Sequence, residues 1–125
     1  MTDAARTVEV HLTNSTNVDP SVRSAVADGN NSVWIAGEQP DSGQVVKQWD
    51  SVVWGVFTPA AADAASATVS LAGEGNSAID ISLTNPPNGT SAVTASSNDE
   101  IQATVTQLDG VDDHAVWQVV LSLRR

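Results

Sequence analysis

Few side chains in this sequence have the types and spacing that catalytic or metal chemistry requires. His11 and His114 are the only histidines, and neither has a second ligand at His-x-x-x-His or Glu-x-x-His spacing. Transition-metal sites are commonly built on such spacings. We therefore expect both histidines to be ordinary strand residues rather than metal ligands.

Residues 109–113 are the one segment in which oxygen ligands cluster. Asp109, Asp112 and Asp113 supply carboxylates, and Ca²⁺ takes about six to eight such hard oxygen ligands. The spacing does not match the Asp-x-Asp-x-Asp-Gly loop, and Asp50, Asp99 and Glu100 would add ligands only if the fold gathered them. We predict a hairpin turn without a metal here, and calcium binding stays the alternative.

The motifs of the common catalytic sites are missing. The chain has no cysteine, no Gly-x-Ser-x-Gly elbow and no phosphate-binding glycine array, so these patterns indicate neither a thiolate site nor a nucleotide site. A Ser-His-Asp site is defined by geometry, and spacing alone does not exclude it. We expect a non-enzymatic protein that needs no cofactor.

Tryptophan is the residue type that points most directly to binding. The chain has four tryptophans, one phenylalanine and no tyrosine. An indole buries a large apolar area and keeps one N–H donor, so it can anchor a core, stack on a sugar or lie at a bilayer interface. Trp54 and Trp117 are in register with valines, and we predict that they are core residues. Trp34 and Trp49 border polar turns and are our candidate ligand contacts.

The charge of the chain restricts its partners. Fifteen acidic and five basic residues give a formal charge of −10, which repels nucleic acid and anionic lipid headgroups. We expect no nucleic-acid partner, and any membrane target should be neutral or zwitterionic overall.

The elements that must position these residues are strands. Valine, threonine and serine are abundant and long helical windows are absent, which favours an all-β chain. Turn signals separate the β-prone runs at roughly eight-to-twelve-residue spacing, as in a sandwich or barrel. We predict a single-domain antiparallel β-sandwich of nine or ten short strands, at residues 7–14, 22–27, 32–36, 45–49, 52–57, 68–72, 78–84, 91–95, 100–108 and 115–123.

The strand at residues 78–84 shows the pattern most clearly. Ile79, Ile81 and Leu83 alternate with polar residues, so one face of the strand should be buried and the other exposed to water. Pro86 and Pro87 then remove two backbone donors and end the strand, so an exposed, rigid loop should follow. The alanine-rich residues 60–67 are predicted to form a loop with some helix.

The chain should form one domain over residues 1–125, with an ordered core at about 7–123. Its first residues have neither a basic nor an apolar signal-peptide region, and no run approaches a membrane span. We expect a soluble protein, synthesised in the cytoplasm without a signal peptide and able to act outside the cell after release.

The order of these features resembles the aegerolysin family of small β-sandwich proteins with an actinoporin-like fold. The resemblance covers most of the chain and rests on the opening strand VEVHLTNST at residues 8–16, on Trp34 before a proline-containing turn, on the strand pair from Trp49 to Phe57, and on the NPPNG loop at residues 85–89. It implies an acidic sandwich that recognises membrane lipids, often sphingolipids, and that assists a larger partner in forming pores. By this resemblance Trp34, Trp49, Pro86 and Pro87 are candidate lipid contacts.

Three functions from different classes stay open. The first is a module that binds neutral or zwitterionic membrane lipid, as a component of a cytolytic or toxin system. The second is a lectin-like sandwich that stacks sugars on Trp34 or Trp49. The third is a structural subunit in which residues 7–14 pair with a neighbouring chain by β-augmentation, a form of self-association or protein partnership.

Overall fold

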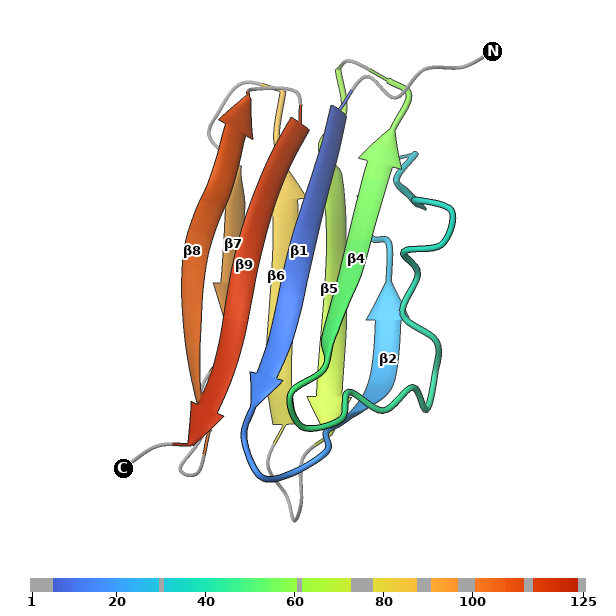
Figure 1. Cartoon of the computed structure of the whole chain (residues 1–125). Coiled ribbons are helices and arrows are strands. Elements are labelled where there is room, and N and C mark those ends of the chain that lie inside the picture. Colours follow the sequence, from blue (N-terminus) through green and yellow to red (C-terminus); the bar gives the residue numbers. More distant parts are fainter. Residues whose placement is uncertain are drawn as a thin grey trace.

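Alternating burial along the chain separates two β-sheets that pack face to face (Figure 1). The computed structural model describes residues 6–29, 31–60, 62–72, 78–87, 91–96, 101–111 and 114–123, and these residues include strands and turns but no helix. The all-β sandwich predicted from the sequence is confirmed. The nine strands are β1 (Arg6–Ser15), β2 (Ser21–Val26), β3 (Val33–Trp34), β4 (Ser51–Thr58), β5 (Ala65–Ala72), β6 (Ala78–Asn85), β7 (Ala92–Ala95), β8 (Ile101–Val111) and β9 (His114–Leu123).

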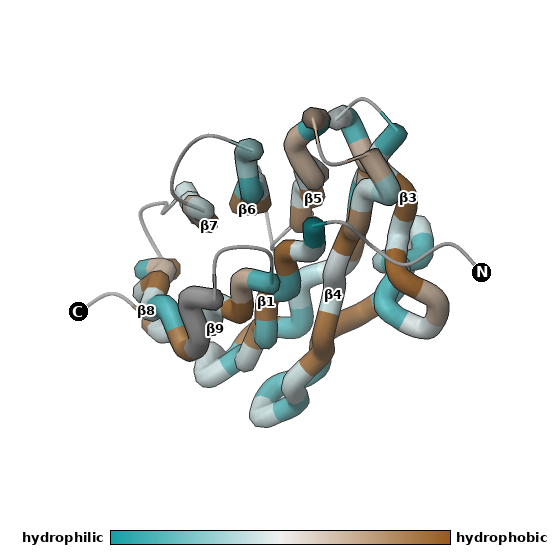
Figure 2. Tube along the Cα trace, turned by 90° about the horizontal axis from the view of Figure 1, so that it is seen from above, coloured by the Kyte–Doolittle hydropathy of each residue, from teal (hydrophilic) through white to brown (hydrophobic). Residues whose placement is uncertain are grey.

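One sheet has the strand order β3-β4-β1-β9-β8 and the other the order β2-β5-β6-β7. We call them sheet A and sheet B. All neighbours pair antiparallel except β1 and β9, which run parallel from Thr7 opposite His114 to Ser15 opposite Ser122. Figure 2 shows the two layers from above, with β8, β9, β1 and β4 on one side and β7, β6 and β5 on the other.

Strand β1 lies inside sheet A, paired with β4 along one edge and with β9 along the other. Its backbone donors and acceptors are therefore already used by the ladders on both sides. The hypothesis that residues 7–14 add to a neighbouring chain is wrong, because β-augmentation requires an unpaired edge. The outer strands are β3 and β8 in sheet A, and β2 and β7 in sheet B.

The core lies between the sheets and consists mostly of aliphatic side chains. Alternate residues of β1 are buried, among them Val8, Val10 and Leu12, and the inward face predicted for residues 78–84 of β6 is confirmed. The buried hydrophobic residues on β6 are Ile79, Ile81 and Leu83. Burying one face of each strand removes apolar surface from water, which is the main stabilising contribution to such a fold.

The predicted strand at residues 45–49 does not form. Only Val45 makes an isolated bridge, to Ser21, and residues 47–50 form a turn. Val46 is nevertheless buried, so its hydrophobic side chain packs in the core without a ladder. The β-propensity of a residue reflects how well its side chain packs on a partly buried surface. Here Val46 packs in this way although its backbone is not paired in a strand.

Two further segments differ from the sequence prediction. Strand β5 begins at Ala65, inside the alanine-rich window, because Ala65 and Ala67 are buried opposite Asn85 and Leu83 of β6. Strand β8 continues to Val111, so residues 109–111 belong to a strand rather than to the predicted turn. Residues 112–113 lie outside the described residues. For the two alanines, burial and pairing within the sheet override the helix propensity of the residue.

The tryptophans divide between core and surface. Trp54 is 1% exposed, and Trp34 and Trp117 are half-buried and pack against the core. Trp117 donates its indole N–H to Ser91 Oγ at 3.2 Å. Alternation along β9 places Leu123 on the same side as the buried Val119 and Leu121, but Leu123 is 42% exposed because it lies at the end of the strand. No helix in the described part of the chain is long and apolar enough to cross a bilayer.

We expect Trp54→Ala to lower the free energy of unfolding by about 3–5 kcal/mol, since it leaves a large cavity in the core. Trp117→Ala should cost about half as much, because this ring is only half-buried and the site can collapse more easily. Urea denaturation followed by circular dichroism measures both values. Equal losses would contradict the difference in burial.

Candidate functional site

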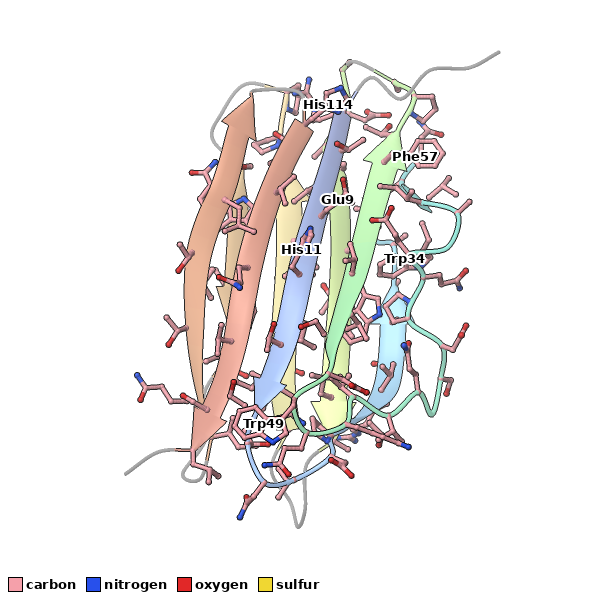
Figure 3. The ribbon with its side chains drawn as sticks, in the orientation of Figure 1. Glu9, His11, Trp34, Trp49, Phe57 and His114 are labelled. Carbon is pink, nitrogen blue, oxygen red and sulfur yellow. The ribbon has the colours of Figure 1, made fainter. Side chains whose placement is uncertain are left out.

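The most exposed large hydrophobic side chain described is that of Trp49, at 70%. It lies in the turn of residues 47–50, which the Asp50 N–H closes by donating to the Lys47 carbonyl at 3.0 Å. Figure 3 shows the ring at the end of sheet A where β1 ends. Lys47, Gln48 and Asp50 around it are also exposed. The turn therefore presents one apolar ring among polar side chains.

Trp49 has a backbone angle φ of 70°, in the left-handed region. At the third position of a four-residue turn this is the geometry of a type II turn, where glycine or asparagine is normal. For a residue with a Cβ atom, this left-handed conformation costs about 1–2 kcal/mol. Strained backbone of this kind is concentrated at binding and catalytic sites, so it marks this residue as a functional candidate.

Asn14 at the end of β1 holds the turn from both sides. Its carbonyl accepts the Trp49 N–H at 2.6 Å, and its own N–H donates to the Asp50 carbonyl at 3.0 Å. The Asn14 side chain is fully buried, and its amide donates to the carbonyls of Val18 and Val46 at 2.7 and 2.8 Å. These bonds fix the strained turn to the sheet, so the ring is presented in one place.

The other predicted contact residues lie elsewhere. Pro86 and Pro87 are half-buried and follow Asn85, whose side-chain amide donates to the Thr7 carbonyl at 2.9 Å. Thr7 and Asn14 are seven residues apart on β1, which at about 3.3 Å per residue separates the prolines from Trp49 by about 23 Å.

Trp34 lies on β3, the edge strand of sheet A, two strands away from β1. It pairs with Val56, which pairs with Val8 of β1, and Val56 is buried. Trp34 therefore faces the core at the β3 edge of sheet A (Figure 3). The four residues do not come together into one site, and Trp49 is the one most available to a ligand.

A second feature on the outer face of sheet A is a pair of carboxyl groups, Glu9 on β1 and Glu38 in the segment that follows β3. They meet over Gly55 of β4, which is paired with Glu9. A Cβ atom on Gly55 would lie 2.8 Å from Glu38 Oε1 and 2.8 Å from Glu9 Cγ. The missing side chain of Gly55 is what lets the two glutamates approach each other.

Three effects together raise the pKa of Glu38 from its ordinary 4.5 to about 7: burial, which contributes most, a hydrogen bond to the Glu9 side chain, and the charge of Glu9. Glu38 Oε1 is buried without a hydrogen-bond partner in the described structure. A hydrogen bond between two carboxyl groups requires a proton on one of them. Glu38 is therefore the natural holder of that proton.

The two histidines lie on β1 and β9, the first and the last strand along the chain, both in sheet A. His114 Nδ1 lies 2.9 Å from Thr7 Oγ1, a cross-strand contact, and His11 lies on the same outward face of β1 (Figure 3). Among the residues the structure describes, no group of three or more histidine, aspartate or glutamate side chains is placed to hold a metal ion. The side chains of residues 109–113 lie outside the described part of the structure, so calcium binding there stays a prediction.

Sequence analysis missed the carboxyl pair and the role of Asn14. One signal for the pair was Gly55 inside the β-prone run VVWGVF, since a glycine within a strand often marks the close approach of another group. The position of Glu38 was not foreseeable, because nothing local predicts that its segment reaches β4.

No family model and no curated protein matches the chain. Among solved structures, that of IP-1A from Alcaligenes faecalis is similar, with 13% sequence identity and a TM-score of 0.65 over 99% of this chain and 95% of that chain. At this level of identity the similarity shows the fold alone. It supports the β-sandwich architecture and is silent about the ligand.

We expect the free energy of unfolding of Trp49→Gly to be about 1 kcal/mol higher than that of Trp49→Ala, because glycine adopts positive φ without steric cost. Neither variant should fall far below the wild type, since the ring is mostly exposed. Chemical denaturation of the two variants side by side measures the difference. A less stable glycine variant would show that the turn is unstrained.

The raised pKa of Glu38 makes stability depend on pH. Because the folded protein holds the proton more tightly than the unfolded chain, this contribution is fully present below pH 4.5 and is lost as the pH rises through about 7. We therefore expect the free energy of unfolding of the wild type, measured relative to that of Glu38→Gln, to fall as the pH rises over this range. A difference independent of pH would contradict the assignment.

Proposed function

We propose that this chain is a non-enzymatic binding module for neutral or zwitterionic membrane lipid, with Trp49 as its principal contact. The observation that carries the proposal is the 70% exposed indole at a φ of 70°. Strained backbone is concentrated at functional sites, so a strained turn that exposes one apolar ring to solvent favours a role for that ring in binding a partner. At a lipid headgroup the ring enters the apolar region while its N–H stays hydrogen-bonded.

Charge selects the kind of membrane. With a formal charge of −10, docking on anionic lipid would work against the field of the protein, whereas neutral or zwitterionic lipid carries no such penalty. Binding driven by an indole rather than by charge should also survive added salt.

The resemblance to the aegerolysin family supports the same reading and extends it. It suggests sphingolipid among the targets and a role as a component of a cytolytic or toxin system, together with a larger partner. Trp34, Pro86 and Pro87 stay predicted contacts on this basis. Because they lie apart from Trp49, they would touch a membrane only in a second orientation or through a partner.

Sugar binding is the second candidate, favoured by the polar neighbours of the same ring. Gln48 and Asp50 are exposed on either side of Trp49, and a flat indole flanked by hydrogen-bonding groups also suits a sugar ring. The two functions use one residue and differ in their ligand.

The test is co-sedimentation with vesicles of sphingomyelin, phosphatidylcholine and cholesterol, and with vesicles that contain phosphatidylserine, at low and high salt. Trp49→Gly should bind the neutral vesicles about tenfold more weakly, since burying an exposed large side chain is worth about 1–2 kcal/mol. Glycine is chosen because it suits the backbone of the turn.

Leu108→Ala is the matched control, because Leu108 is an exposed apolar residue on β8, 52% exposed and away from the turn. It should bind like the wild type. Equal binding by Trp49→Gly, or binding only to anionic vesicles at low salt, would remove the lipid proposal. Quenching of tryptophan fluorescence by neutral oligosaccharides, lost in Trp49→Gly, would favour the sugar instead.

A further inference from the structure

Residues 35–46 connect the outer edges of the two sheets, and we call this segment the strap. At its beginning the Ile35 N–H donates to the Gly55 carbonyl of β4 at 2.9 Å, and the Gly55 N–H donates to the Glu38 carbonyl at 3.1 Å. At its end the strap bonds to β2 through Val22. Figure 1 shows it running beside β4 and then beside β2.

The two anchors differ in chemistry. The β2 anchor consists of backbone bonds, in which Val22 N–H donates to the Gln44 carbonyl at 2.8 Å and Gly43 N–H donates to the Val22 carbonyl at 2.9 Å. It is supported by the buried side chains of Pro40 and Val46. The β4 anchor adds the Glu9–Glu38 carboxyl pair, and it is the one whose strength a proton can change.

We propose that the Glu9–Glu38 pair is a pH-sensitive latch for the first part of the strap. With one proton between them the two carboxyl groups hydrogen-bond and hold residues 35–38 on β4. Without it, two carboxylates face each other over Gly55, and their repulsion opens this anchor while the β2 anchor stays closed. The latch does not rest on the proposed lipid binding.

The groups around the pair offer the second negative charge little compensation. Strand β4 and the rest of described residues 31–40 contribute no other charged side chain. Strand β1 contributes His11, two residues beyond Glu9 on the same face, and Arg6, which belongs to the inward series and donates from Nε to the Asp63 carbonyl. Strand β9, beyond β1, contributes His114, which contacts Thr7.

The geometry of Glu38 explains why the pair cannot simply separate. Its Oε1 atom is buried without a partner, and leaving a carboxylate oxygen buried and unpaired is costly. The turn of residues 35–38, closed by the Glu38 N–H donating to the Ile35 carbonyl at 2.9 Å with Gly37 at a φ of 82°, directs the side chain back onto β4. Relief therefore requires the segment itself to move.

Strand β3 should follow the latch. It consists of Val33 and Trp34 alone, paired with Phe57 and Val56 of β4, so it has few bonds of its own to keep it in place. Trp34 is half-buried at this edge. Opening of residues 35–38 should therefore expose its indole to water.

The experiment is amide hydrogen exchange of the full chain by nuclear magnetic resonance between about pH 5 and pH 8, expressed as protection factors to remove the intrinsic pH dependence. The Ile35 and Gly55 amides report the β4 anchor, and the Val22 and Gly43 amides report the β2 anchor. One pKa unit corresponds to a tenfold change in an equilibrium. We expect protection at the first anchor to fall by at least about tenfold as the pH rises, and protection at the second to stay constant.

Variants assign the titrating group. Glu38→Gln keeps the shape of the side chain and supplies a permanent hydrogen-bond donor, so protection at the first anchor should stay constant across the pH range. Glu9→Gln supplies a permanent donor on the other side chain of the pair and should have the same effect. Gly55→Ala should give low protection at the first anchor at every pH, because its Cβ would displace Glu38. Asp80→Asn removes one exposed charge from sheet B and should leave the transition unchanged.

Two outcomes would overturn the latch. The first is constant protection at Ile35 and Gly55 in the wild type, which would mean that the pair does not control the strap. The second is a transition that persists in Glu38→Gln and Glu9→Gln but disappears in His11→Asn, which would assign it to the imidazole. Since vesicle binding is measured separately, failure of either proposal leaves the other intact.

Discussion

The parallel pairing of the first and last strands holds the rest of the structure in place. Nine residue pairs join β1 to β9, from Thr7 with His114 to Ser15 with Ser122. Parallel strands cannot be joined by a hairpin, and here the chain between them forms the whole of sheet B and the three other strands of sheet A, which are β3, β4 and β8. Strand β1 thereby becomes an internal strand with a buried face of Val8, Val10 and Leu12. Removing this pairing would expose two edges of sheet A and open its side of the core.

Each functional feature takes its position from a different point on β1. At the end of the strand, Asn14 fixes the turn that presents Trp49. In the middle, Glu9 meets Glu38 over Gly55. At the beginning, Thr7 receives the side chain of Asn85 and so places the two prolines that follow it. Because one strand sets these three positions, they are spread along its length rather than brought together at one point.

Negative charge is used in two ways. Over the whole surface a formal charge of −10 opposes close approach of like-charged surfaces and anionic groups. Within sheet A, the carboxyl groups of Glu9 and Glu38 lie close together, because burial and a shared hydrogen bond favour the protonated form of Glu38. The exposed indole of Trp49 lies in the turn of residues 47–50, apart from this pair, so the proposed ligand contact and the proposed pH response use different parts of the molecule.

The sequence by itself determined which residues face inward and where most strands lie, because alternation along a strand is a local property. Val8, Val10 and Leu12, and Ile79, Ile81 and Leu83, follow from it directly, as does the all-β class. Its errors came where local propensity conflicts with packing: residues 45–49 pack without a ladder, Ala65 starts a strand, and residues 109–111 extend one. Strand order, the internal position of β1 and the approach of Glu38 to Glu9 were decided only by the tertiary structure, since each depends on which distant segments bury one another. The same holds for Trp49. Its sequence neighbours are compatible with a strand, and only the hydrogen bonds from Asn14 and Asp50 turn it outward with a positive φ.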